Sequence, residues 1–190
     1  MPLSAALPRQ HIHTRQVECR GFRRDDGLWD IEGHLTDVKT YAFASEFRGS
    51  VEPGDPVHEM RIRLTVDDDL IVRDIEAVTD KSPFPVCPAI APNFARLKGL
   101  SIRTGFLSKV RERLGGVEGC THLVELMGPI ATTAYQTIYP YRHRLTREAG
   151  ATEPKPTEKP RLIGTCHAFK SDGEVVQRLW PDFYTGAAPR

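Results

Sequence analysis

The stretch Leu28-Trp29-Asp30-Ile31-Glu32-Gly33-His34-Leu35 alternates between apolar and polar residues along most of its length. Such alternation is typical of a β-strand that buries one face. The run from 13 to 22 has a similar pattern, and Asp25-Asp26-Gly27 between the two runs has turn chemistry, so this region predicts a β-hairpin. Two further alternating runs, 57–66 and 70–79, flank three consecutive aspartates and predict a second hairpin.

After residue 80 the pattern changes from strands to helices. Residues 93–97 and 105–114 have helical composition, and a stop glycine comes shortly after each run, at Gly99 and Gly115. A long helix is expected from 120 to 138, because apolar residues recur there at helical spacing. Strands followed by helices predict an α+β fold, with helices packed on one face of an antiparallel β-sheet.

The remaining segments define the expected domain organisation. Residues 1–10 carry two prolines and predict an extended arm, and residues 11–190 are expected to form a single α+β domain. Within it, residues 40–56 predict a loop or lid, and 146–160 a surface linker rich in Pro, Glu, Lys and Thr. Residues 161–180, with Ser171-Asp172-Gly173 as a turn, predict a C-terminal hairpin that returns to the sheet.

Composition narrows the class of protein. The chain has 190 residues and a formal net charge of +1, which argues against a dedicated nucleic-acid binder. Its start does not have the pattern of a secretory signal, and no apolar run approaches the length that spans a membrane. We therefore expect a cytoplasmic protein with reduced cysteines, no membrane or nucleic-acid partner, a small-molecule substrate and possible homo-oligomers.

The segment 119–126 carries the best chemical signal. It brings Cys120, His122 and Glu125 to the start of the predicted long helix, where unpaired backbone donors favour a thiolate. Taken alone, a free cysteine is more often a small buried hydrophobe, and a histidine here is satisfied equally well in a core. Cys120 and His122 line one pocket only if Cys120 takes the cap position, where the backbone is still extended.

Three segments resemble a bacterial family known only as a domain of unknown function, DUF2889: Gly27 to Gly33, Cys87 to Pro92 and Gly119 to Ala134. Residues 56–136 also resemble, more distantly, the iron–sulfur cluster assembly scaffolds of the NifU type. That resemblance implies that Cys87 and Cys120 match two of the three ligand cysteines. Pro56 stands at the position of the first cysteine, and His58 falls near the aspartate of the scaffold.

Two functions from different classes follow. In one, Cys87, Cys120 and His58 bind zinc or iron, and the protein handles metals or clusters. In the other, His58, Glu59, His122 and Glu125 transfer protons in a small-molecule enzyme.

The sequence favours the enzyme, because the first ligand cysteine of the scaffold is replaced by Pro56 while acid–base residues are kept. No nucleotide-binding loop and no flavin or nicotinamide signature is visible, which disfavours redox chemistry that needs those cofactors. Proton-transfer chemistry is therefore expected, with a lyase as the first choice. Aromatic residues in the predicted lid and pocket segments suit a phenolic, lignin-derived substrate, although ordinary core packing is the more common reason for such residues. The DUF2889 resemblance suggests aromatic compound catabolism, for example retro-aldol loss of formaldehyde.

Overall fold

The computed structural model describes residues 3–151 and 155–187. The chain divides into two compact units, Met1–Arg142 and His143–Arg190. The prediction of one domain over 11–190 differs from this division.

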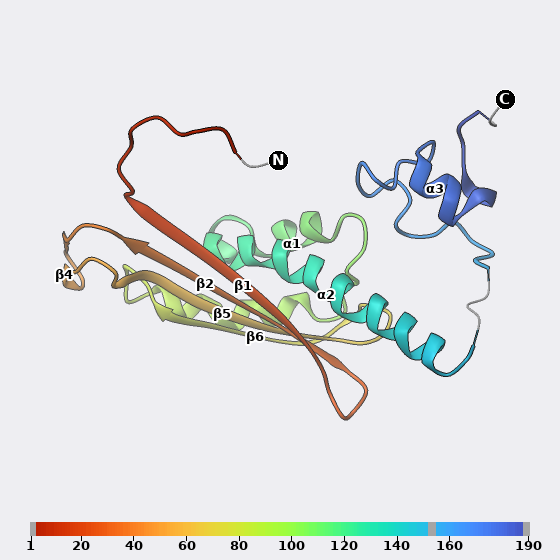
Figure 1. Ribbon diagram of the computed structural model, residues 1–190. Coiled ribbons are helices and arrows are strands. Elements are labelled where there is room, and N and C mark those ends of the chain that lie inside the picture. The colour runs from red at the N-terminus through yellow and green to blue at the C-terminus, as the bar shows by residue number, and fades with distance from the viewer. Residues whose placement is uncertain (1–2, 152–154, 188–190) are drawn as a thin grey trace. The chain divides into compact units, whose positions relative to one another are not determined.

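The first unit is built on a four-stranded antiparallel sheet with strand order β1-β2-β5-β6 (Figure 1). The strands are β1 (His13–Arg23), β2 (Trp29–Lys39), β5 (Pro56–Val66) and β6 (Val72–Lys81). Both predicted hairpins are thereby confirmed. The segment 40–56, predicted as a loop or lid, contains a small separate hairpin of β3 (Phe43–Ser45) and β4 (Gly49–Val51).

The helical segments follow the sheet in sequence and share its core. They are η1 (Cys87–Leu97), α1 (Phe106–Leu114), η2 (Gly116–Glu118) and α2 (Thr121–Glu148). Alternate residues of β2 are buried from Trp29 to Leu35, as expected for a strand with one covered face. These residues form one core with the apolar stripe of α2, which confirms the α+β fold. The buried residues of that stripe are Leu123, Leu126, Met127, Ile130, Ala134 and Ile138.

Two glycines allow α2 to lie close to the sheet. A Cβ atom on Gly33 of β2 would be 2.7 Å from Ile130 Cδ1, well inside normal contact distance. A Cβ atom on Gly21 of β1 would overlap the side chain of Thr137. The helix therefore lies against β1 and β2 at positions where no side chain separates the two layers.

The second unit differs from its prediction. Residues 174–179, expected as the second strand of a hairpin, form helix α3 (Glu174–Leu179), followed by η3 (Pro181–Phe183). The predicted C-terminal hairpin is therefore wrong, because the turn residues at 171–173 precede a helix, with Gly173 at its N-cap.

Two predicted segments fall partly on residues outside the described ranges. The predicted linker 146–160 begins within α2, and its residues 152–154 lie outside the described part of the chain. Residues 3–10 of the predicted arm are exposed and contain no helix or strand, and residues 1–2 also lie outside the described ranges. Among the described residues, no helix combines the length and apolar character needed to span a membrane.

Candidate active site

Three charged or titratable residues form a row across the sheet. Arg15 on β1 lies directly opposite Asp37 on β2, and Asp37 lies directly opposite His58 on β5. Because opposite residues in an antiparallel pair project from the same face, the three side chains meet on one face. Asp37 follows Trp29, Ile31 and Leu35 in the alternation of β2, so this is the face that the helices cover.

Asp37 is the centre of the group, and its side chain is only 2% exposed. Its Oδ1 accepts hydrogen bonds from Arg15 Nε at 2.8 Å and from His13 Nε2 at 3.1 Å. Its Oδ2 accepts from Arg15 Nη2 at 2.8 Å and from His58 Nδ1 at 3.1 Å. A carboxylate offers about four lone-pair sites, and all of them are occupied here.

These contacts determine the charge of Asp37. Burial alone raises the pKa of this carboxyl, but the hydrogen bonds and positive charge of Arg15, with further help from His13 and His58, outweigh burial and lower the pKa to about 2. Asp37 is therefore ionised at neutral pH.

His58 is oriented by this ionised carboxylate. A carboxylate without a proton only accepts hydrogen bonds, so Nδ1 of His58 carries the hydrogen that is shared with Asp37. In the neutral ring, Nε2 then has a free lone pair. Burial and the neighbouring ring of His122 lower the pKa of His58 below 6.5, so the neutral ring predominates at neutral pH.

His122 reaches the same point from the first turn of α2. Its ring lies 3.8 Å from that of His58 between centroids, with 31° between the planes. Its Nε2 is 3.7 Å from Asp37 Oδ2, and burial and Arg15 lower its pKa. Two imidazoles this close disfavour simultaneous protonation, so the pair carries one proton more readily than two.

Cys120 occupies the cap position of α2, which is the position it needs if it and His122 are to line one pocket. Helix α2 begins at Thr121, and the carbonyl of Cys120 accepts a hydrogen bond from the Val124 N–H at 2.9 Å. Cys120 Sγ is then 3.9 Å from His122 Nδ1 and 3.8 Å from Met60 Sδ. The thiol therefore borders the histidine pair.

Glu125 joins the group through Arg15. Its carboxylate accepts a hydrogen bond from Arg15 Nη1 at 2.6 Å. The guanidinium thus links the start of α2 to β1 and to Asp37.

Two expected residues lie elsewhere. Glu59 is adjacent to His58 in β5, so its side chain projects from the opposite face, where it contacts His34 and Arg61. Cys87 begins η1 and is not within ligand distance of the group around His58.

Three participants were not singled out from the sequence: His13, Arg15 and Asp37. One signal was available, because Asp37 places a carboxylate at the next position of an otherwise apolar face of β2.

The described residues contain one group of three metal-ligand side chains whose ligand atoms all lie within 4.8 Å: Asp37, His58 and His122. Two imidazoles and a carboxylate are a suitable donor set for zinc or iron. However, the lone pairs of Asp37 are already used by Arg15, His13 and His58. An ion would have to displace one of these donors, whereas proton transfer uses the arrangement as it stands.

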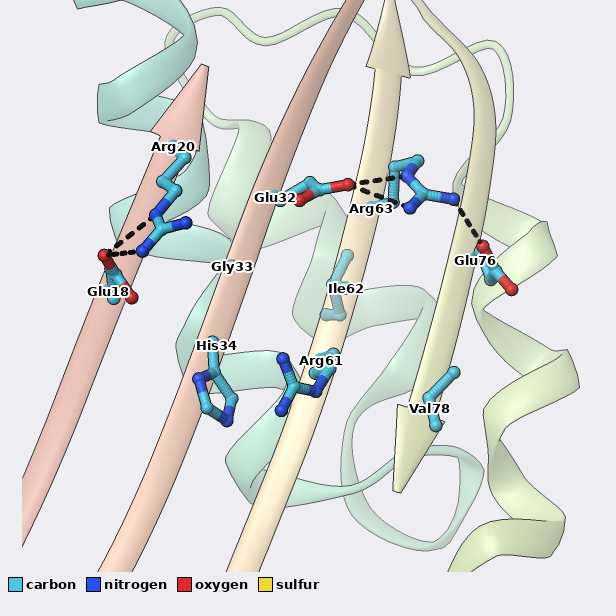
Figure 2. Close-up of a pocket in the computed structure, with 10 residues that line it drawn as sticks. All are labelled: Glu18, Arg20, Glu32, Gly33, His34, Arg61, Ile62, Arg63, Glu76 and Val78. Carbon is cyan, nitrogen blue, oxygen red and sulfur yellow. Dashed lines mark hydrogen bonds and ion pairs between the residues drawn. The ribbon is translucent and has the colours of Figure 1, made fainter. Parts of the chain in front are cut away.

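A hollow of about 490 Å³ lies on the opposite face of the sheet (Figure 2). Its arginines are paired with carboxylates: Arg63 lies between Glu32 and Glu76, and Arg20 contacts Glu18 (Figure 2). This hollow therefore offers little unpaired charge to a ligand and is separated from Asp37 by the sheet itself.

The fold and the site define an α+β protein with a buried aspartate–histidine group on the covered face of an antiparallel sheet. The chain belongs to the family described as proteins of unknown function, DUF2889, whose model matches residues 13–136. That range contains every member of the group, from His13 to Glu125. Comparisons with curated proteins and with solved structures give no match, and the resemblance to NifU-type scaffolds is not shown.

Proposed function

We propose that this protein is an enzyme that uses His58 as a general base, and that it is a lyase acting on a phenolic aromatic substrate. The observation that supports the proposal is the hydrogen bond from His58 Nδ1 to the buried, ionised Asp37 at 3.1 Å. This bond fixes the ring and leaves Nε2 as the proton acceptor. A general base must be held in position and must carry no proton before it acts, and burial, which lowers the pKa of His58, favours the neutral ring.

The candidate reaction is loss of formaldehyde from a substrate that bears a hydroxymethyl group. His58 Nε2 removes the hydroxyl proton, and the oxygen forms the carbonyl of formaldehyde as the adjacent carbon–carbon bond breaks. The electron pair of that bond enters the conjugated ring system, which then takes a proton back from the imidazolium. Asp37 stabilises the imidazolium while the proton is held.

Handling of zinc or iron is the second candidate. It is supported by the short separations between the ligand atoms of Asp37, His58 and His122. We rank it lower because Arg15 and His13 already donate hydrogen bonds to the carboxylate of Asp37. In addition, neither Cys87 nor Cys120 belongs to this group of ligand atoms.

Release of formaldehyde from hydroxymethyl-bearing phenols, measured with the purified protein, tests the proposal. We expect release with the wild type and a loss of about a hundredfold or more in His58→Gln. The matched control is His34→Gln, because His34 lies on the same sheet but on the opposite face, bonded to Glu59. Equal rates in wild type and His58→Gln would refute the assignment of the base, and metal analysis of the same preparation tests the second candidate.

A further inference from the structure

Lys39 is the last residue of β2 and projects from the same face as Asp37, two residues earlier. It lies directly opposite His13, which itself bonds Asp37. At about 3.3 Å per residue, the backbone of Lys39 is roughly 7 Å from that of Asp37. The lysine therefore lies at the rim of the candidate active site.

The ammonium group of Lys39 is not neutralised by an acid. Among the described residues, no carboxylate lies within ion-pair distance of it, and its Nζ is 5.3 Å from the ring centroid of Tyr41 and 5.9 Å from that of Phe43. Arg15 differs, because its guanidinium is shared between Asp37 and Glu125. Lys39 is thus a cation at this end of the sheet without an acidic partner among the described residues, and its donors are free for a ligand.

The hairpin that carries Phe43 is attached to the sheet by main-chain and side-chain hydrogen bonds. The Gly54 N–H donates to the Lys39 carbonyl at 3.0 Å, and Arg48 Nη1 donates to the Pro56 carbonyl at 2.9 Å. These bonds attach the β3–β4 hairpin to the end of β2 and the start of β5 (Figure 1).

Aromatic rings on this segment are open to solvent. Phe47, in the β3–β4 hairpin, meets Phe84 edge-on at 5.6 Å between centroids. Phe47 and Phe84 are 55% and 50% exposed, and Tyr41 is 44% exposed. Of these rings Tyr41 lies beside Lys39, and an exposed ring beside a cation offers a ligand both stacking and charge.

We propose that Lys39, Tyr41 and Phe43 form a binding site for an aromatic ring that carries an anionic oxygen, a carboxylate or a phenolate. Only the link between this site and catalysis rests on the proposed function: an aromatic anion held by Lys39 would extend towards His58. Binding itself requires only the unpaired ammonium and the two rings.

Calorimetric titration of the full chain tests the site with four probes. Benzoate supplies ring and charge, benzamide the ring alone, cyclohexanecarboxylate the charge alone, and pentafluorophenolate tests a phenolate in place of a carboxylate. We expect benzoate or pentafluorophenolate to bind more tightly than the other two. In Lys39→Met, the affinity should fall about tenfold or more, as expected for loss of a charged hydrogen-bond donor.

Lys109→Met is the matched control, because Lys109 is exposed on α1 and has no acidic partner among the described residues. Unchanged benzoate affinity in Lys39→Met, equal binding of cyclohexanecarboxylate, or no binding of either aromatic anion to the wild type would each overturn the site. His58→Gln separates the two proposals: it should retain benzoate binding while losing turnover. Binding that depends on Lys39 without any formaldehyde release would refute the lyase and leave the site standing.

Discussion

Arg15 lies directly opposite Asp37 on neighbouring strands, and its guanidinium donates to both carboxylate oxygens at 2.8 Å. This two-point contact stabilises the charged carboxylate of Asp37, which is nearly inaccessible to water. The same guanidinium contacts Glu125 on α2, so one side chain connects the edge strand, the buried carboxylate and the helix that carries His122.

Replacing Arg15 with Gln should destabilise the fold, because Asp37 would keep its burial and lose two charged donors. We expect the free energy of unfolding to fall by about 1–3 kcal/mol, as measured by urea denaturation. Glu125→Gln is the control: Glu125 is 53% exposed, so its loss should cost less than about 1 kcal/mol. If both substitutions lowered the free energy of unfolding equally, the contacts between Arg15 and the buried Asp37 would not be the ones that stabilise the fold.

Asp37 should make stability depend on pH in the acid range. Its pKa is about 2 in the folded protein and 3.8 ordinarily, so the folded state favours the ionised form. The stabilisation is complete above the ordinary value and is lost as the pH falls through the folded one. The difference in unfolding free energy between wild type and Asp37→Asn should therefore shrink between about pH 4 and pH 2. A difference that stays constant over this range would argue against an ionised Asp37.

The rate of the proposed reaction should follow the neutral form of His58. Because burial and His122 lower the pKa of His58 below 6.5, kcat/KM should be constant near neutral pH and fall in acid, with a midpoint below 6.5. A pH profile of formaldehyde release checks this. A midpoint above 6.5 would require an imidazole that is stabilised in its charged form, contrary to the contacts described.

His122→Gln distinguishes a catalytic histidine from a structural one. If His122 shares the proton held by His58, turnover should fall by roughly a hundredfold to ten-thousandfold while the melting temperature changes little. If it only fills space beside His58, the melting temperature should drop and the turnover per folded molecule should stay the same. Both quantities are measured on one preparation, and near-normal turnover would remove His122 from the catalytic group.

The close contact of α2 with the sheet predicts unequal effects for two Gly→Ala substitutions. Gly33→Ala should be destabilising by about 1–3 kcal/mol, because the new methyl group meets Ile130 at 2.7 Å and the packed layers must separate. Gly128→Ala should cost less, about 1 kcal/mol or below, because beyond its chain neighbours the new methyl group meets only Leu107, at 3.8 Å, while the gain in helix propensity is offset by the disfavoured helical conformation before Pro129. Thermal unfolding of both variants checks the prediction, and a stable Gly33→Ala protein would contradict the packing.

Hydrophobic periodicity predicted the elements of the first unit well. The two hairpins and the long helix have strong patterns with period 2 or 3.6, and local turn residues mark their ends. Residues 174–179 were misassigned because a run of six residues is too short for its period to separate helix from strand.

The candidate site could be predicted only in part. His122 and Cys120 are close in sequence, so a helix start was enough to place them together. Arg15, Asp37 and His58 meet only through the register of three strands, and a single sequence does not specify that register. The same alternation explains Glu59, because neighbouring residues in a strand project from opposite faces.

β1 is an edge strand of the sheet, and it supplies both His13 and Arg15 to Asp37. Edge strands and chain ends open locally at lower free energy than the centre of a sheet. Such an opening would remove three of the four hydrogen bonds to Asp37 at once, while β2 and β5 remain paired under α2. The candidate active site therefore depends on an edge strand of the sheet. Its hydrogen bonds can be lost while the core beneath it stays folded.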